Sequence, residues 1–156
     1  MLFRKLFDNR EQPVEINENL LRAITNAIEA HPKEFVNYWS RGRVYDYLGK
    51  YQQAISDYTR VISLNPNFLG AYINRGADYV HFDDIGRAVE DFNRAIQIAS
   101  DNAMTYHNRS YCHYRSGEFE AAYQDASQAI QRDPEFPDAY IARARISLDA
   151  RLGSPQ

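Results

Sequence analysis

The sequence predicts an all-α protein in which helical hairpins stack in a row. Three observations support this fold class. The same residue types recur 34 positions apart, apolar and small residues follow helical spacing in two runs within each 34-residue unit, and glycine or proline stands at the breaks. Because one hairpin is too small to bury its own apolar face, neighbouring hairpins must stack to form a core.

The clearest recurring series is a row of four arginines, each preceded by a tyrosine three residues earlier and followed by a small residue. The arginines are Arg41, Arg75, Arg109 and Arg143. The tyrosines are Tyr38, Tyr72, Tyr106 and Tyr140, and the small residues are Gly42, Gly76, Ser110 and Ala144. Two further series lie in the second run of each unit: Ala54, Ala88 and Ala122, and Asp57, Asp91 and Asp125. So many positions in phase indicate a true structural repeat.

The breaks within and between units have the residues that end helices. Gly49 and Gly117 suit the left-handed conformation that follows a helix end, whereas Asp83 stands at the corresponding break of the middle unit and tolerates that conformation less well. Pro66 and Pro134 end two units, because proline cannot continue a helix. Each unit is therefore expected to be two amphipathic helices joined by a short turn.

A 34-residue helix–turn–helix with aromatic, small, tyrosine, alanine, aromatic, alanine and proline positions in this order resembles the tetratricopeptide repeat. The resemblance covers three complete repeats, 35–68, 69–102 and 103–136, and implies a right-handed α–α superhelix. The chain departs from the family pattern in four ways. Arginine replaces the usual leucine beside the small residue, Ala126 replaces an aromatic residue, His113 replaces a tyrosine, and Ser100 replaces the terminal proline.

Residues outside the three repeats are expected to complete the stack. Residues 1–34 form an N-terminal extension in which only 20–32 matches a second helix of a repeat. Residues 137–156 match a first helix, starting at Pro137, followed by a tail, and are expected to form a C-terminal capping helix. The outward face of this helix is predicted to include Arg143, Ile146 and Ala150.

The N-terminal stretch MLFRKLF has apolar residues on one stripe beside Arg4 and Lys5. We favour a short helix docked on the first hairpin. Self-association through this stripe, insertion into the protein's own groove and attachment to a membrane surface are alternatives in descending order.

The four arginines are expected to hold helices together, because an unpaired buried charge is costly. In the family this position faces neighbouring helices, and the in-phase aspartates are the natural partners, since guanidinium meets carboxylate through two parallel hydrogen bonds. We predict pairing between repeats, namely Asp57 with Arg75, Asp91 with Arg109, and Asp125 with Arg143. The alternative register pairs each arginine within its own repeat and leaves Arg143 over. A phosphate-binding row is the less favoured interpretation.

The family lines a concave groove with its first helices. By position, the resemblance implies a predicted groove surface of Trp39, Arg43, Tyr47, Ile73, Asn74, His81, His107, Asn108, Tyr111, Tyr114, Arg115 and Arg145, beside Asp46, Ala77 and Ile141. Some members bind a C-terminal carboxylate with a clamp of lysine, asparagine and arginine. This sequence keeps Asn74 but has Trp39, Arg43, Met104 and Asn108 at the other clamp positions, so we expect no standard clamp.

Composition and motifs narrow the function classes. Net charge is −3, the pI is about 5.8 and no run of some 20 apolar residues is present, so neither a nucleic acid nor a membrane is an expected partner. One cysteine, Cys112, favours a reducing, cytoplasmic location. No motif for nucleotide, metal or nucleophilic catalysis is present, and the spacing of His107, Cys112 and His113 does not place all three on one helical face. We therefore expect a protein that is not an enzyme and has no cofactor.

The sequence thus favours a protein-binding module that holds a peptide or helix of another protein. Two alternatives remain: a dedicated chaperone of the bacterial secretion or assembly type, and a self-assembling structural scaffold. In the scaffold, the N-terminal segment or the C-terminal helix mediates contacts, including those of a homodimer.

Overall fold

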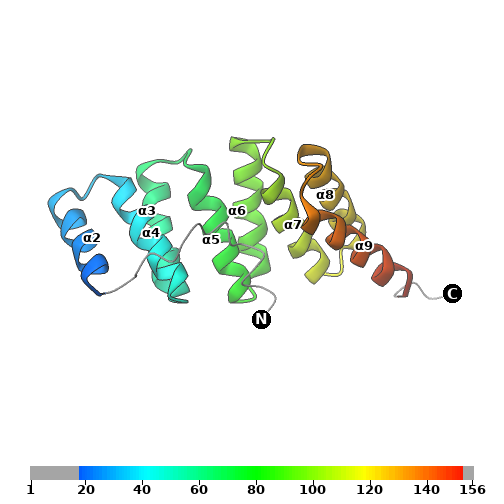
Figure 1. The fold of residues 1–156 in the computed structure, drawn as a ribbon, viewed down its shortest axis with the longest axis horizontal. Coiled ribbons are helices and arrows are strands. Elements are labelled where there is room, and N and C mark those ends of the chain that lie inside the picture. Colours follow the sequence, from blue (N-terminus) through cyan, green and yellow to red (C-terminus); the bar gives the residue numbers. More distant parts are fainter. Residues whose placement is uncertain (1–17, 153–156) are drawn as a thin grey trace.

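The computed structural model describes residues 18–152, and all regular elements within that range are helices (Figure 1). The all-α prediction is therefore confirmed for these residues. The elements are α2 (Glu18–Ala30), α3 (Phe35–Tyr47), α4 (Tyr51–Leu64), α5 (Leu69–His81), α6 (Ile85–Ile98), α7 (Ala103–Arg115), α8 (Phe119–Arg132) and α9 (Pro137–Leu152). The MLFRKLF stretch and its predicted roles lie outside the described residues.

Each predicted repeat contains one pair of neighbouring helices: α3 with α4, α5 with α6, and α7 with α8. The turns inside the pairs contain Gly49, Asp83 and Gly117, with φ angles of +71°, +58° and +77°. The two glycines adopt this left-handed conformation at little cost, whereas Asp83 adopts it despite its side chain. Asp84 then begins α6 by accepting a hydrogen bond from the backbone nitrogen of Arg87 at 3.2 Å.

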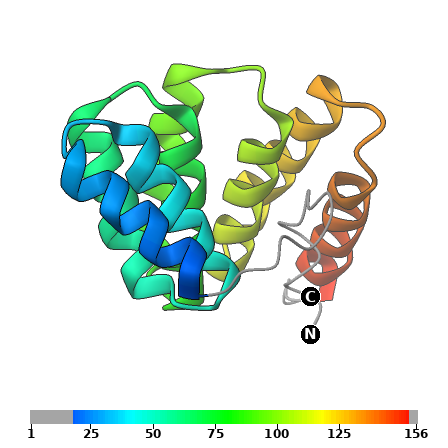
Figure 2. The ribbon, with the colours of Figure 1, turned by 60° about the vertical axis from the view of Figure 1, so that its left-hand side comes forward.

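The helices form a single row from α2 to α9, and the row is curved when seen from a second direction (Figures 1 and 2). Second helices pack both on the first helix of their own pair and on the first helix of the next pair, as α4 does with α3 and α5. None of the helices in the described range is long and apolar enough to cross a membrane.

A tyrosine ties each first helix to the carbonyl group at the end of the preceding unit. The hydroxyl groups of Tyr38, Tyr72 and Tyr140 donate to the backbone oxygens of Pro32, Pro66 and Pro134 at 3.1–3.2 Å. Where Ser100 replaces the proline, the tie changes. Arg132 donates through Nε to the carbonyl oxygen of Ser100 at 2.5 Å and through Nη2 to the Tyr106 hydroxyl at 3.0 Å. An arginine thus bridges the two groups.

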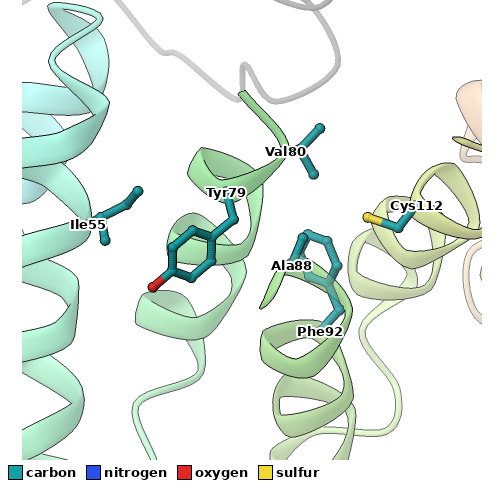
Figure 3. Close-up of a cluster of buried hydrophobic side chains, with 6 residues drawn as sticks. All are labelled: Ile55, Tyr79, Val80, Ala88, Phe92 and Cys112. Atoms are coloured by element: carbon teal, nitrogen blue, oxygen red, sulfur yellow. The ribbon is translucent and has the colours of Figure 1, made fainter. Parts of the chain in front are cut away.

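The core between helices is a series of small clusters, one of which joins α4, α5, α6 and α7 through Ile55, Tyr79, Val80, Ala88, Phe92 and Cys112 (Figure 3). Phe92 is fully buried in it, and Tyr58 has the same role one repeat earlier.

The glycine beside Arg41 and Arg75 allows a side chain of the second helix to approach closely. A Cβ atom on Gly42 would meet Cε1 of Tyr58 at 2.7 Å, and one on Gly76 would meet Cε1 of Phe92 at 2.8 Å. The two glycines therefore make room for the aromatic rings. In the third repeat Ser110 replaces glycine and Ala126 replaces the ring, so the larger and smaller side chains exchange places.

Candidate functional site

Three of the four arginines hold an aspartate of their own repeat. Nε and Nη2 of Arg41 donate to the two carboxylate oxygens of Asp57, both at 2.8 Å. The same geometry joins Arg75 to Asp91 at 2.8 and 2.7 Å, and Arg109 to Asp125 at 2.7 Å for both bonds. The predicted pairing between repeats is therefore wrong and the alternative register is correct. The aspartate lies on the second helix directly packed against its own first helix, which brings the two groups face to face.

The third guanidinium nitrogen links each arginine to the preceding repeat. Nη1 of Arg75 donates to the hydroxyl of Thr59 at 2.9 Å, and Nη1 of Arg109 donates to Oδ1 of Asn93 at 2.6 Å. These guanidinium groups therefore use all three nitrogens within the protein. This arrangement fits the structural interpretation and leaves them unsuited to a row of phosphate-binding groups.

The first repeat places Trp39 and Arg43 together on α3. The indole packs edge-on against Phe68, with ring centres 4.9 Å apart, and lies 5.4 Å from the ring centre of Tyr58. The exposed guanidinium of Arg43 lies 5.9 Å from the indole ring. Tyr47 is half-buried near the end of the same helix. This end of the predicted groove surface is thus aromatic, and the Arg43 guanidinium lies over the Trp39 ring.

The second repeat places Ile73 and Asn74 half-buried on α5. Nδ2 of Asn74 donates to the Tyr58 hydroxyl at 3.2 Å, so this amide already has a partner inside the protein. His81 stacks face to face on Tyr51 with ring centres 3.9 Å apart. Desolvation lowers the pKa of His81 below its ordinary value, so the stacked ring is neutral at pH 7.

The third repeat differs because two of its predicted groove residues are buried. His107 and Asn108 are 5% and 2% exposed. His107 packs edge-on against Phe136, and its Nδ1 atom, like both side-chain polar atoms of Asn108, has no hydrogen-bond partner within the described part of the chain. Desolvation lowers the pKa of His107. In this structure these two side chains line the interior rather than an open surface.

Tyr111, Tyr114 and Arg115 lie at the C-terminal end of α7, and Arg145 lies on α9, which packs against α7. Arg115 donates to the Tyr111 hydroxyl at 2.9 Å and to Oδ1 of Asp83 at 2.8 Å, which connects α7 with the turn before α6. The Tyr114 hydroxyl donates to Oδ2 of Asp149 on α9 at 2.5 Å. Arg145 lies 5.5 Å from the Tyr114 ring. Ion pairs and aromatic rings therefore bridge three elements here.

Sequence reasoning missed Asp78, whose side chain is buried on α5 with the residue 1% exposed. Its Oδ2 atom lacks a hydrogen-bond partner among the described residues. Desolvation, with a smaller contribution from the charge of Asp46, raises the pKa of Asp78 to about 9. This carboxyl group is therefore protonated at pH 7. Its position in the repeat could have predicted this burial, because the corresponding residues of the neighbouring repeats, Val44 and Cys112, are apolar and buried.

The three residues that resemble a metal-ligand set have separate environments. Cys112 is fully buried against the cluster of Figure 3, where desolvation raises the pKa of its thiol to about 12. His113 contacts Glu118 through Nδ1 at 2.5 Å, whereas His107 packs on Phe136. Within residues 18–152 no three histidine, cysteine or acidic side chains are grouped as metal ligands.

Two matches to models of the tetratricopeptide repeat cover residues 40–68 and 104–136, within the first and third predicted repeats. The chain belongs to the tetratricopeptide repeat family. No curated protein matches the sequence.

Solved structures of tetratricopeptide repeat proteins share this fold. A crystal structure of MamA aligns with a TM-score of 0.81 and 22% identity over 85% of this chain and 77% of MamA. The first such domain of Spaghetti (RPAP3), solved with the HSP90 peptide SRMEEVD, gives 0.74 and 22% over 76% of this chain and 94% of that domain. The corresponding domain of OM64 from Arabidopsis gives 0.72 and 22% over 74% and 95%.

Proposed function

We propose that this tetratricopeptide repeat chain is a non-catalytic protein-binding module that holds a peptide or helix of a partner protein on its predicted groove surface. The observation that carries the proposal is the set of half-buried aromatic side chains on two of the first helices: Trp39 and Tyr47 on α3, and Tyr111 and Tyr114 on α7. Partly exposed aromatic residues contribute much of the binding energy at protein interfaces, because they bury a large area at little entropic cost.

The structural relatives support a peptide ligand in general and not one particular peptide. The Spaghetti (RPAP3) domain is seen with an HSP90 peptide, which shows that this fold can present a peptide-binding surface. At the positions of the carboxylate clamp, however, our chain has Trp39 beneath Arg43 and a buried Asn108. We therefore propose a ligand recognised through aromatic contacts rather than through its C-terminal carboxylate.

Affinity capture from a lysate of the source cells, with the bound proteins identified by mass spectrometry, tests this function. Trp39→Ala and Tyr111→Ala are each expected to reduce recovery of the same partner several-fold, because each removes an aromatic contact from a different first helix. Glu90→Ala changes an exposed side chain of the second helix α6 and is the matched control. The melting temperature of each variant shows whether the fold is intact.

Arg43→Ala provides a second test that leaves the aromatic packing in place, because the Arg43 side chain is exposed. Unchanged recovery of the partner by Trp39→Ala, Tyr111→Ala and Arg43→Ala, with all three folded, would place binding elsewhere and refute the groove proposal.

A further inference from the structure

Arg143 on α9 has the tyrosine neighbour of the other three arginines, but within residues 18–152 its guanidinium has neither their carboxylate nor their hydrogen-bond acceptor on the preceding helix pair. Its guanidinium lies 5.8 Å from the ring centre of Tyr140 and 5.9 Å from that of Tyr123. Arg41, Arg75 and Arg109 lie 5.6–6.0 Å from the corresponding tyrosines of their own helices. Those three also hold a carboxylate, whereas no carboxylate within residues 18–152 contacts Arg143.

The carboxylate that Arg143 lacks within residues 18–152 is one that a second helix would supply. Each aspartate partner stands on the second helix that packs beside its arginine, and no second helix in the described range follows α9. The face that such a helix would cover is open: Tyr140 and Tyr123 are 42% and 40% exposed, and Ala144 is exposed. Beside it, Tyr123 and Ser147 help to line a hollow of about 300 Å³.

One residue predicted for the outward face of α9 is not available to a partner. Ile146 is 3% exposed and packs against Ala122 and Ala126 of α8. The prediction that Ile146 points outward is therefore wrong, because this position is in phase with the buried Cys112 and not with the arginines. The open face is accordingly defined by Tyr140, Arg143, Ala144 and Ser147.

The repeats themselves specify the chemistry of a helix that fits this face. Where the small residue is glycine, the residue after the aspartate is aromatic, as in Gly76 with Phe92. Where it has a Cβ atom, as in Ser110, the residue after the aspartate is the small Ala126. Since Ala144 also has a Cβ atom, an aromatic ring at that point would overlap it. The complementary helix therefore has a carboxylate followed directly by a small residue.

A second copy of this chain could offer α2, which matches the second helix of a repeat, but α2 lacks a carboxylate followed by a small residue at the matching position. The residue of α2 in phase with the aspartates is Ala23, and the next is Ile24. Docking α2 of another copy on α9 in the register of the repeats would leave Arg143 without a carboxylate. Charge complementarity thus favours a different protein.

We propose that the open face of α9 is a second binding surface, separate from the groove, which accepts an amphipathic helix of a partner protein. The partner helix takes the place of a second helix and supplies an aspartate or glutamate to Arg143, with a small residue next to it. Three copies of the same arrangement within the chain provide its geometry.

The sequence of residues 117–133 contains the required Asp125 and Ala126 and supplies a synthetic helical peptide as the probe. Fluorescence anisotropy measures the affinity of the labelled peptide for the full chain. The peptide with Asp125→Asn, and the protein with Arg143→Gln, are each expected to bind about tenfold more weakly, because each removes one half of a partly buried charge pair. The peptide with Ala126→Phe is also expected to bind more weakly, because its ring would meet Ala144.

Arg145→Gln is the matched control, because it removes the same charge from the same helix at an exposed position on the predicted groove side. It is expected to change the affinity less than twofold. Absence of saturable binding up to about 1 mM chain overturns the proposal. Equal affinity of the Asp125→Asn peptide, or a larger loss from Arg145→Gln than from Arg143→Gln, also overturns it.

Light scattering of the chain alone tests whether a second copy of the chain occupies the open face instead. A mass that stays monomeric over the accessible concentration range is expected. A concentration-dependent dimer or polymer that Arg143→Gln abolishes would assign the face to a second copy and overturn the proposal of a different partner.

Discussion

The carboxylate of Asp91 on α6 accepts two parallel hydrogen bonds from the guanidinium of Arg75 on α5, from Nε at 2.8 Å and from Nη2 at 2.7 Å. The side chains of Arg75 and Asp91 are only 16% and 7% exposed. The pair therefore joins the two helices of one repeat inside the protein, where the cost of losing either partner is high.

Asp91→Ala is expected to lower the free energy of unfolding by about 3 kcal/mol, because the Arg75 charge would stay largely buried without a partner. Glu90→Ala changes the exposed neighbour on the same helix and is expected to stay within about 0.5 kcal/mol of the parent protein. Urea denaturation of both variants measures the difference. Equal midpoints would show that the pair contributes nothing to stability.

The 34-residue period was enough to predict the helices and turns, but it did not decide which aspartate each arginine holds. Each second helix packs against two first helices, one on either side, and both candidate registers preserve the same period. Only the geometry shows that Asp57 lies opposite Arg41 and not opposite Arg75. The repeat determines which positions face a neighbouring helix. The packing of the helices determines whether that neighbour belongs to the same repeat or to the next one.

The predicted groove surface illustrates a second limit of the sequence. Position within a repeat predicts the direction of a side chain but not what covers it. The burial of His107 and Asn108 was therefore not predicted, because their positions belong to the groove in the family. Asp78 was missed for the opposite reason. A charged residue is normally expected to be exposed, but the two residues in phase with Asp78, Val44 and Cys112, are both buried.

The two glycines Gly76 and Gly86 are expected to respond to the same substitution with opposite signs. A Cβ atom on Gly76 would lie 2.8 Å from Cε1 of Phe92, so Gly76→Ala forces a fully buried ring to move and is expected to cost about 1–3 kcal/mol. Gly86 is exposed in α6 with nothing within 4 Å of its Cβ position. Gly86→Ala is expected to stabilise by about 0.5–1 kcal/mol through helix propensity alone.

Thermal denaturation of the two glycine variants compares these effects directly. Stabilisation by Gly76→Ala would mean that α5 and α6 separate enough to admit the methyl group, and would contradict the packing derived for Phe92.

The amide of Asn74 and the hydroxyl of Tyr58 form a hydrogen bond that the next repeat lacks. Asn108 is in phase with Asn74 and Phe92 is in phase with Tyr58, and the Asn108 side chain has no partner among the described residues. Tyr58→Phe is expected to destabilise by about 1 kcal/mol, because it leaves Asn74 in the situation of Asn108. Phe92→Tyr is expected to stabilise by a similar amount, about 1 kcal/mol, by giving Asn108 a partner.

Urea denaturation of the single variants and of Phe92→Tyr combined with Asn108→Leu tests this relation. If the new hydroxyl acts through Asn108, its stabilising effect disappears in the double variant. A gain from Phe92→Tyr that persists without Asn108 would refute the explanation.

Asp78 is expected to make the protein less stable as the pH rises from 5 to 8. Its pKa is about 9 in the folded chain and near 3.8 when the chain is unfolded, so within this range the folded state holds one more proton than the unfolded state. The free energy of unfolding therefore loses up to about 1.4 kcal/mol per pH unit from this group. Below the unfolded pKa its contribution is complete, and above pH 9 it is lost.

Asp78→Asn isolates this contribution, because asparagine has the shape of the protonated carboxyl group and does not titrate. The variant is expected to be more stable than the parent protein at pH 8, with a difference that shrinks toward pH 5. His81 and His107 act with the opposite sign, since their lowered pKa values remove stability as the pH falls, but they are present in both proteins and cancel in the difference. A difference in unfolding free energy that stays constant from pH 5 to pH 8 would show that Asp78 is ionised in the folded chain.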